Sequence, residues 1–497
     1  MNPLLLTDGY KLGHKEQYPQ GTTKVYSNWT PRKSRIKGID SVVFFGLQYF
    51  IKEYLITQFN DEFFSQPKAA VVAEYKKYVD NYLGVNYDIS HIEALHDLGY
   101  LPIEIKALPE GVEVPIRTPM FTIVNTLPEF FWITNYLETL LSNIIWQPCT
   151  SATIAKQYKT ILTKFALETD KENTDFINWQ GHDFSMRGMS GIESSMLSGM
   201  GHALSFTGSD TFPVLASLEK YYKADITKEI VIGSVHATEH SVMCAGSKEG
   251  EIETFKHLLQ TYPTGILSIV SDTWDLWKVL TIYLPKLKEE ILNRDGKLVI
   301  RPDSGNPVDI ICGCEHDDPI IKKGVIELLW DEFGGSINSQ GYKVLHPKIG
   351  AIYGDSITID RAVQICERLK SKGFASTNVV LGIGSFTYQY NTRDTFGFAM
   401  KATYVEIHGE GRAIFKDPIT DDGTKKSAKG LIQLFEKDGK IHFKDECTLL
   451  EEKEGLLTPV FKNGDLLHEL SLQDIRTNIS KSTKDVNYEK IAVITDI

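Results

Sequence analysis

Residues 297–304 read KLVIRPDS, a short apolar run that ends in Arg301 and Asp303. Its body has the aliphatic, β-branched composition of a buried strand, and its charges come only at the end. Six further stretches repeat this pattern, with helix-length segments between them: HDFSM (182–186), HALSF (202–206), IVIGSV (230–235), ILSIVSD (266–272), KIGAIYGD (348–355) and VVLGIGS (379–385). This repetition predicts β-α units on a parallel sheet.

Polar or glycine residues follow the apolar part of each run: Arg187, Asp210, Ser234, Asp272, Arg301 with Asp303, Gly354 with Asp355, and Gly384 with Ser385. In a closed α/β barrel these strand ends converge on one face, where the active site lies. An open, doubly wound sheet is the alternative, with its ligand at a switch point. Seven polar strand ends are more than one crevice needs, so the pattern favours the barrel.

The two ends of the chain predict a second domain. Residues 101–126 (LPIEIKALPEGVEVPIRTPMFTIVNT) alternate like hairpin strands, and HGEG (408–411) and KDGK (437–440) are hairpin turn signals. We therefore expect a barrel over residues 180–386. An α+β domain built from residues 1–179 and 387–497 would flank it.

Composition excludes several classes of partner. The 497 residues include 53 Lys and Arg against 65 Asp and Glu, a net charge of −12. Nucleic acids and anionic membranes need a basic face, so neither is an expected partner, and an anionic substrate must be held by a local cluster of cations.

The sequence also predicts a cytoplasmic protein. Six cysteines in this length show no disulfide framework, as in a reducing compartment. The start, MNPLLLTDGYK, lacks the basic region of a signal peptide, and the apolar window 130–146 is interrupted by Asn135, Glu138 and Asn143. We interpret that window as a buried helix and not as a membrane span.

Cations near the strand ends indicate phosphate recognition. They are Arg187, Arg301, Arg393, Lys401, Lys416 and the lysines of the loop 425–429. Gly382-Ile383-Gly384-Ser385 offers backbone N–H groups to a phosphate, and Asp272, Asp303 and Asp355 can hold ribose hydroxyls or Mg²⁺. The segment Asp421-Asp422-Gly423-Thr424 is interpreted as a polar turn.

His236-Ala-Thr-Glu239-His240 matches the H-x-x-E-H pattern of a zinc peptidase. That interpretation requires a helix and a third ligand, yet the motif directly follows a strand-like run. A structural histidine pair is a second possibility. The third, which we favour, places His240 in a site at a strand end.

Ten stretches carry a resemblance that covers essentially the whole chain. They are LLLTDGYKLGHKEQYPQGTTKVYS, LPIEIKALPEG, HDFSMRG, GSDT, ATEHSV, SIVSDTWD, IRPDSGNP, YGD, TRD and FKDP, and their order and spacing resemble the nicotinamide phosphoribosyltransferases. This family is of the second structural type of phosphoribosyltransferases. The resemblance implies an irregular α/β barrel and a homodimer with sites between subunits. It also implies NAD salvage chemistry, in which 5-phosphoribosyl 1-pyrophosphate and nicotinamide give nicotinamide mononucleotide and pyrophosphate.

The resemblance also implies site residues. Nicotinamide would contact Phe184, Asp210, Ser268, Arg301 and, from the other subunit, Tyr10. The ribose and 5′-phosphate would contact Asp303, Gly354, Asp355, Gly384, Ser385 and Arg393. Pyrophosphate would contact Arg187, His240, Arg301, Arg32, Lys401 and Lys416. His240, Asp303 and Arg301 would be catalytic, with ATP as a co-substrate that phosphorylates His240. Mg²⁺ would be carried mainly by pyrophosphate, with no dedicated protein ligands.

The chain departs from better-known animal members of the family at three places. Phe386 stands in a glycine run, the lysines of 425–429 are offset by about a residue, and His236 replaces a proline. Three alternatives remain: nicotinate as the substrate, a zinc peptidase, and a dimeric binding protein without catalysis. Asp210 discriminates the first, because a carboxylate accepts an amide N–H and repels a second carboxylate.

Overall fold

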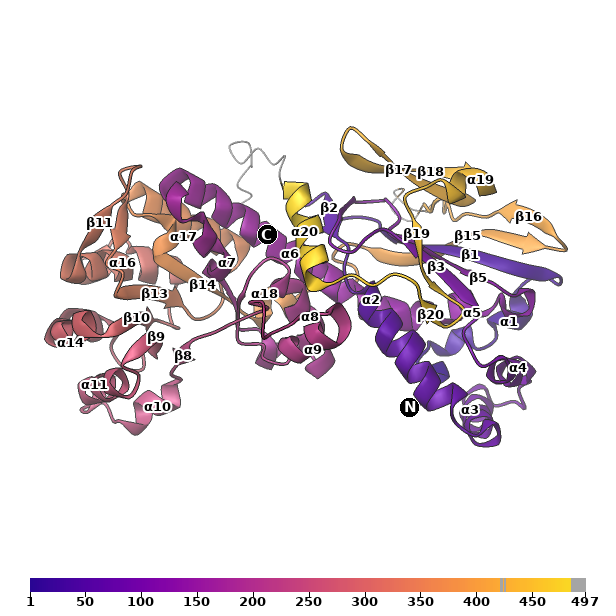
Figure 1. Ribbon diagram of the computed structural model, residues 1–497, viewed down its shortest axis with the longest axis horizontal. Helices are drawn as coiled ribbons and strands as arrows, with labels where there is room; N and C mark the ends of the chain where they lie inside the picture. The colour runs from indigo at the N-terminus through magenta and orange to yellow at the C-terminus, as the bar shows by residue number, and fades with distance from the viewer. Residues whose placement is uncertain (421–422, 424–425, 484–497) are drawn as a thin grey trace. The chain divides into compact units, whose positions relative to one another are not determined.

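The computed structural model describes residues 1–420, 423 and 426–483, and the chain forms two compact units (Figure 1). Of the described residues, unit 1 contains those within 1–153, 216–225 and 391–483, and unit 2 contains 154–215 and 226–390. These bounds differ from the ranges expected from the sequence. The change from unit 1 to unit 2 falls within one long helix, α6 (Glu138–Thr169), and residues 216–225 belong to unit 1 because Tyr222 packs on Phe45 there, with ring centroids 5.0 Å apart.

Unit 1 is built on a seven-stranded antiparallel sheet. The strand order is β16 (Glu410–Ala413), β15 (Phe398–Ile407), β1 (Thr22–Pro31), β5 (Phe121–Asn125), β3 (Ile103–Ala107), β19 (Thr458–Lys462) and β20 (Asp465–Leu466). β1 pairs with β15 along its length, from Thr22 opposite Ile407 to Pro31 opposite Phe398. The prediction that both chain ends build one α+β domain is therefore confirmed.

Trp29 of β1 forms the aromatic centre of this sheet. It is fully buried, and its ring stacks on Phe398 of β15 at 5.7 Å and on Phe121 of β5 at 6.1 Å. These residues come from the two ends of the sequence, so their burial fixes the pairing of β1 with β15.

Two hairpins of unit 1 form at the expected turns. His408 and Gly409 join β15 to β16 with φ of 52° and 79°, and Asp438 and Gly439 join β17 (Leu431–Lys437) to β18 (Lys440–Cys447) with φ of 52° and 70°. Two consecutive positive φ values are the geometry that two-residue hairpin turns require. A short pair, β2 (Ser41–Val43) and β4 (Glu113–Pro115), completes the strands described in unit 1.

Helices complete unit 1. They are α1 (His14–Gln17), α2 (Leu47–Phe50), α3 (Lys68–Leu83), α4 (Ser90–Leu98), α5 (Ile133–Tyr136), α19 (Leu449–Lys453) and α20 (Leu472–Thr483). No helix in the described part of the chain is long and apolar enough to cross a membrane.

Unit 2 contains the parallel sheet. Its order is β7 (Gly208–Ser209), β6 (Gly181–Asp183), β14 (Val379–Ile383), β13 (Ile349–Tyr353), β10 (Asp295–Arg301), β9 (Thr264–Val270) and β8 (His236–Ala237). Every neighbouring pair is parallel. A further pair, β11 (Gly335–Ile337) and β12 (Lys343–Leu345), is antiparallel.

The parallel sheet curls back on itself. Gly208 of the edge strand β7 forms a parallel bridge with Gly233, which lies just before β8 at the opposite edge. Gly233 N–H donates to Thr207 (2.7 Å), and Ser209 N–H donates to Gly233 (3.1 Å). The expected irregular barrel is therefore confirmed as a curled, incompletely closed one.

Two of the seven expected strands lie elsewhere than predicted. HALSF (202–206) is the buried end of helix α8 (Ile192–Ala203) and the turn after it, and the strand comes at Gly208. IVIGSV contributes only the bridge at Gly233, and β8 starts at His236. Both errors have one cause, since periodicity cannot distinguish a short apolar run in a strand from one in a buried helix or connection.

The remaining helices of unit 2 alternate with the strands, and many lie on the outside of the sheet in Figure 1. They are α7 (Ile177–Gln180), α9 (Val214–Tyr222, continuing into unit 1), α10 (His240–Ala245), α11 (Glu251–Thr261), α12 (Leu276–Lys278), α13 (Leu284–Lys286), α14 (Lys288–Asn293), α15 (Pro307–Cys312), α16 (Pro319–Phe333), α17 (Ile359–Ser371) and α18 (Ser385–Gln389).

β10 shows how the strands position a site. Leu298 and Ile300 are buried, whereas the alternate residues Lys297, Val299 and Arg301 line a cavity. Successive side chains of a strand point to opposite faces, so KLVIR supplies both the core and the cavity wall.

We expect Trp29→Ala to lower the free energy of unfolding of unit 1 by about 3–5 kcal/mol, because it removes a fully buried aromatic side chain. Urea unfolding followed by circular dichroism measures the effect. Leu450→Ala, at a side chain that is 67% exposed, is the control and should change it by less than about 0.5 kcal/mol. Equal effects of the two variants would contradict the assignment of Trp29 to the core.

Candidate active site

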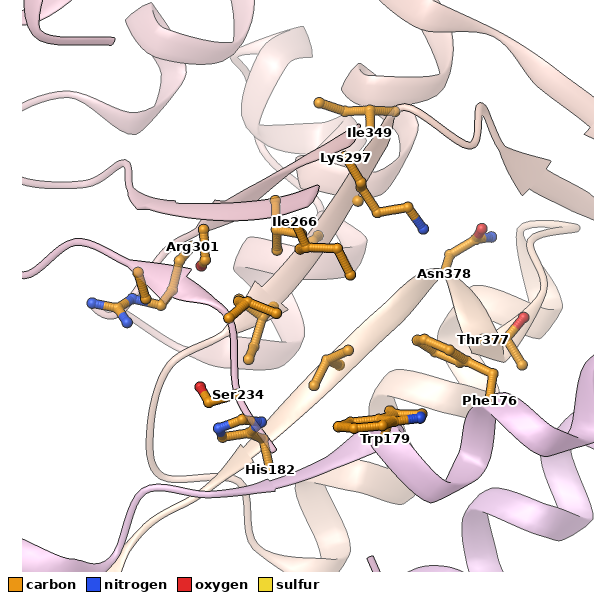
Figure 2. A pocket seen from close by; sticks show the side chains of 18 of the residues that line it. Phe176, Trp179, His182, Ser234, Ile266, Lys297, Arg301, Ile349, Thr377 and Asn378 are labelled. Atoms are coloured by element: carbon orange, nitrogen blue, oxygen red, sulfur yellow. The ribbon is translucent and has the colours of Figure 1, made fainter. Parts of the chain in front are cut away.

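A cavity of about 460 Å³ runs through the inside of the curled sheet of unit 2 (Figure 2). Arg301, Ser234 and His182 lie at one end of the view, and Lys297, Asn378 and Phe176 lie at the other. Arg301 and Lys297 are four residues apart on β10, so the cavity extends about 13 Å from the carboxyl ends of the strands towards their amino ends. Phe184, Asp210 and Ser268 also line it.

Asp210 is held in one orientation at the carboxyl end of this cavity. Its Oδ1 accepts hydrogen bonds from His182 Nε2 at 2.8 Å and from Ser234 Oγ at 2.5 Å. Burial alone would raise the pKa of Asp210, but the His182 and Ser234 hydrogen bonds and the charge of Arg301 outweigh it, and the pKa lies below its usual value. The site therefore presents an ionised carboxylate at neutral pH.

Phe184 and Ser268 stand near this carboxylate on the cavity wall. The Phe184 ring lies 4.5 Å from the His182 ring, and its backbone N–H donates to Ile383 of β14. Ser268 Oγ on β9 is buried and has no hydrogen-bond partner among the described residues. The wall thus combines an aromatic face with an unused hydroxyl, which suits a flat, polar heterocycle.

Arg301 is the central cation of the site. Its Nη2 donates to the Thr238 carbonyl at 2.5 Å, and its Nε is buried without a partner in the described part of the chain. Burial lowers the pKa of Arg301, whereas Asp303, Asp210 and Asp272 raise it. The guanidinium stays charged, because an arginine is not deprotonated in proteins.

Carboxylates surround Arg301. Asp272 Oδ2 accepts from Asp303 N–H (2.8 Å) and Ser304 Oγ (2.5 Å), while its buried Oδ1 has no hydrogen-bond partner within the described residues. Burial raises the pKa of Asp303; Arg301 opposes that shift, and Asp272 and Asp355 reinforce it. The cluster carries more negative charge than one guanidinium neutralises, which favours a ligand with hydroxyl donors or a bound cation.

His240 begins helix α10 beside this cluster. Its Nδ1 is 3.1 Å from Thr273 Oγ, and its Nε2 is 3.9 Å from Asp272 Oδ1 and 3.8 Å from Asp303 Oδ2. The side chain is 47% exposed, so a ligand can reach the ring.

Glycines allow the strand ends to pack closely. A Cβ on Gly354 would lie 2.5 Å from Asp303 Oδ1, and a Cβ on Gly384 would lie 2.2 Å from Asp355 Oδ1. A Cβ on Gly188 would meet Ser385 Oγ at 2.1 Å. The loops after β6, β10, β13 and β14 are therefore in contact. The structure brings together the predicted site residues of unit 2: Phe184, Arg187, Asp210, His240, Ser268, Arg301, Asp303, Gly354, Asp355, Gly384 and Ser385.

The other predicted site residues lie in unit 1: Tyr10, Arg32, Arg393, Lys401 and Lys416. Tyr10 is 64% exposed. Burial lowers the pKa of Lys401, and the charges of Arg32 and Lys416 lower it further against Glu138, so these three cations are close neighbours. Lys425 and the turn 421–424, except Gly423, lie outside the described residues.

Comparison with known proteins agrees with this geometry. Residues 179–464 match the model described as "Nicotinate phosphoribosyltransferase (NAPRTase) family", and residues 2–105 match "Nicotinamide phosphoribosyltransferase, N-terminal domain". A protein of Acinetobacter baylyi named nicotinamide phosphoribosyltransferase is 51% identical, with 98% of this chain and 99% of that protein covered. The chain belongs to the nicotinamide phosphoribosyltransferase family. The resemblance and the enzyme class expected from the sequence, a pentosyltransferase, are confirmed.

More distant relatives agree with this assignment. A nicotinamide phosphoribosyltransferase of Mycoplasma pneumoniae is 37% identical over 86% of this chain and 94% of its own length. Among solved structures, human nicotinic acid phosphoribosyltransferase matches with a TM-score of 0.57 at 15% identity, over 99% of this chain and 96% of that chain. At that identity the likeness shows the fold alone, which is that of the type II phosphoribosyltransferases.

The geometry does not support the zinc peptidase alternative. His236 lies on β8 and stacks on Tyr262 at 4.3 Å, Glu239 is extended, and only His240 is helical. The motif thus changes from strand to helix inside its own length and cannot form the helical pair that this chemistry needs. Across residues 1–420, 423 and 426–483, no group of three His, Cys, Asp or Glu side chains is placed to hold a metal.

Sequence reasoning missed two contributors to the site of this phosphoribosyltransferase family member. His182 orients Asp210, and Thr273 holds Nδ1 of His240. His182 was detectable in principle, because it lies two residues before Phe184 and strand alternation places both on one face. Thr273 follows the end of β9 in a loop whose path no periodic pattern predicts.

We expect Gly354→Ala to raise KM for 5-phosphoribosyl 1-pyrophosphate by about tenfold or more, because the new Cβ displaces Asp303 and weakens hydrogen bonds to a charged group. Steady-state kinetics measure this. Gly350→Ala, on the strand β13 that precedes Gly354, is the control, since its Cβ would meet Lys297 Cδ at 3.4 Å and Val299 Cγ2 at 3.7 Å, which are ordinary contact distances. Similar effects at both positions would remove the reason for a glycine at 354.

Proposed function

We propose that this chain transfers phosphoribosyl from 5-phosphoribosyl 1-pyrophosphate to nicotinamide in the cytoplasm, giving nicotinamide mononucleotide and pyrophosphate for NAD salvage. The observation that carries the choice of substrate is the ionised Asp210 carboxylate, oriented by His182 and Ser234 at the end of an aromatic-walled cavity. The names of the relatives and the match of the N-terminal domain support the same choice.

Asp210 accounts for recognition of an amide. A carboxamide N–H can donate to the Asp210 carboxylate, whereas the carboxylate of nicotinate would face a like charge. Phe184 would stack on one face of the pyridine ring, and the Ser268 hydroxyl, which has no hydrogen-bond partner within the described residues, would bond to the amide. This arrangement sets nicotinamide apart from nicotinate.

Transfer requires one bond to form and one to break at C1 of the ribose. The pyridine nitrogen of nicotinamide forms the new C–N bond, and the C–O bond to pyrophosphate breaks with both electrons leaving on the pyrophosphate. Arg301 and Arg187 would neutralise the leaving group, and Asp303, Gly354 and Asp355 would hold the ribose. Gly384, Ser385 and Arg393 would hold the 5′-phosphate. Positioning and charge neutralisation suffice, so no nucleophilic side chain is needed.

Mg²⁺ is proposed as a cofactor carried mainly by the pyrophosphate group. Asp272 Oδ1, which accepts no hydrogen bond from the described residues, and the neighbouring Asp303 and Asp355 carboxylates fit water-mediated contacts to such an ion. When bound, the ion neutralises part of the pyrophosphate charge.

His240 is proposed to couple ATP hydrolysis to the reaction. With Nδ1–H donated to Thr273, the Nε2 lone pair can attack the γ-phosphorus of ATP. The N–P bond then forms and the P–O bond to ADP breaks. Water later hydrolyses the phosphohistidine to return His240 and release phosphate.

A homodimer is proposed to complete each site. Tyr10 is exposed in its own chain, and the second face of a bound pyridine ring needs an aromatic partner. A symmetric dimer would place Tyr10 of one subunit opposite Phe184 of the other at two equivalent sites.

The direct test is product formation from labelled nicotinamide and labelled nicotinate with 5-phosphoribosyl 1-pyrophosphate and Mg²⁺, with and without ATP. We expect nicotinamide mononucleotide as the main product and a higher yield with ATP. Preferential use of nicotinate would show that the alternative substrate is the correct one.

Asp210→Asn should weaken the use of nicotinamide and relax the rejection of nicotinate, because it removes the charge that discriminates them. We expect the ratio of kcat/KM for nicotinamide over nicotinate to fall by about a hundredfold, in line with the energy of close like-charge pairs. Asp183→Asn is not a suitable control, since Asp183 is buried and bonded to Thr211. Glu253→Gln, at an exposed position of helix α11, is suitable and should leave the ratio unchanged. An unchanged ratio in Asp210→Asn would count against this role of Asp210.

His240→Ala should abolish ATP hydrolysis while some ATP-independent transferase activity remains, since only the phosphorylated residue is lost. Phosphate release and nicotinamide mononucleotide formation are measured in parallel on the same preparation. His236→Ala is the control and should retain both activities. ATP hydrolysis that persists in His240→Ala would exclude the phosphohistidine.

Tyr10→Ala and Phe184→Ala homodimers should both be poorly active, because each lacks one face of the ring sandwich at both sites. Heterodimers made by co-folding the two variants should recover activity, since both lesions then fall in one site and leave the other intact. Activity of the purified mixed dimer is the measurement. If the mixed dimer recovers nothing while each variant remains a folded dimer, the shared-site model is wrong.

A further inference from the structure

Unit 1 contains a second cavity, of about 250 Å³, in which cations outnumber carboxylates. Its walls include Arg32, Arg117, Lys401 and Lys426 against one acid, Asp445, whose Oδ2 already accepts the Lys429 backbone N–H at 3.0 Å. Two of the cations, Arg32 and Lys401, belong to the proposed pyrophosphate contacts. Arg117 belongs to none of the contacts discussed above.

The floor of this cavity is the junction of β1 and β15, which lie side by side in Figure 1. Asn28 is paired with Lys401, and Thr30 is paired with Ala399. Side chains two residues apart on a strand share a face, so these four residues line one side of the cavity. Pairing of the two chain ends therefore creates the cavity.

Arg117 has an unusual backbone. It is the third residue of a turn closed by Thr118 N–H and the Pro115 carbonyl (3.0 Å), and its φ is +74°. A turn of this kind favours glycine or asparagine at that position, because a Cβ is strained there. The Arg117 N–H also donates to Pro31 at 2.6 Å, which fixes the turn beside Arg32.

The strained position presents a guanidinium that has no partner among the described residues. Arg117 is exposed, and within the described residues its side chain forms no hydrogen bond or ion pair. The backbone contacts to Pro31 and Pro115 hold the strained turn, and the side chain that the turn projects lines the cavity, which indicates a functional constraint. Further cations are crowded near this cavity. Burial lowers the pKa of Lys401, and the nearby positive charges of Arg32, Lys416 and Lys11 lower it further.

We propose that Arg117 is a further substrate-binding residue of this enzyme, which together with Arg32 and Lys401 binds the polyphosphate chain of a substrate. A guanidinium matches two phosphate oxygens at once, and three cations around one cavity suit two or more linked phosphates better than a single phosphate. The inference rests on the proposed function for the identity of the polyphosphate, which ATP, 5-phosphoribosyl 1-pyrophosphate and pyrophosphate share.

The test uses the full-length protein and Arg117→Gly. Glycine relieves the backbone strain and removes the guanidinium, so a binding role and a structural role give opposite results. We expect the Kd for pyrophosphate, measured by calorimetric titration, to rise by about tenfold, as for loss of one charge-assisted hydrogen bond. The Tm should stay the same or rise. Arg117→Lys should retain part of the affinity.

Lys223→Gly is the matched control, since it removes another cation at a positive φ (52°) that lies outside the cavity. Its Kd for pyrophosphate should equal that of the wild type. An unchanged Kd for pyrophosphate, ATP and 5-phosphoribosyl 1-pyrophosphate in Arg117→Gly would overturn the proposal, as would a lower Tm with unchanged binding. A higher Kd for all three ligands in Arg117→Gly would show that Arg117 binds the pyrophosphate group that they share. A higher Kd for ATP alone would show that Arg117 binds the triphosphate chain of ATP.

Wild-type synthesis of nicotinamide mononucleotide is measured separately. It reports on the proposed function, whatever the Arg117 variants show. An active wild type with an unaffected Arg117→Gly variant therefore rejects only the inference about Arg117.

Discussion

The Arg301 guanidinium at the carboxyl end of β10 is the charge on which the site in unit 2 depends. Asp210, Asp272 and Asp303 all lie within its electrostatic reach, and burial strengthens each of these interactions. Without this cation the carboxylates would repel one another in a partly buried site. The parallel sheet makes the cluster possible, because it brings strand ends that are distant in sequence to one edge.

Specificity in this account comes from fixing one carboxylate. Asp210 is only partly buried, yet two hydrogen bonds hold its Oδ1, and its lowered pKa keeps it ionised. A rigid, charged acceptor discriminates an amide from an acid more strongly than shape does, because the two ligands have nearly the same volume. His182 and Ser234 act through Asp210 and position it.

Much of the fold was predictable from the sequence, because the strand signal and the site signal coincide. In KLVIRPDS, the alternation that buries Leu298 also directs Arg301 into the cavity, so one pattern predicts both the strand and the site residue. The strand predicted at HALSF (202–206) was wrong because a buried helix end has the same apolar composition as a strand. The unit boundary inside α6 has no composition change to mark it, and a helical pattern gives no reason to divide a helix.

The site residues that could be predicted from the sequence are those that directly follow the ends of strands. His240, Asp303 and Asp355 converge because the topology requires it, whereas the hydroxyl of Thr273 reaches His240 through a loop. Arg117 was not predictable, since its importance lies in a positive φ that the sequence around it, Pro115-Ile116-Arg117-Thr118, does not indicate. The most direct test of the central claim is a crystal structure of the full-length protein with nicotinamide mononucleotide and pyrophosphate. The account predicts the amide nitrogen within hydrogen-bond distance of Asp210 and a pyrophosphate oxygen within that distance of Arg301. An amide bound away from Asp210, or an Arg301 that contacts no phosphate, would contradict it.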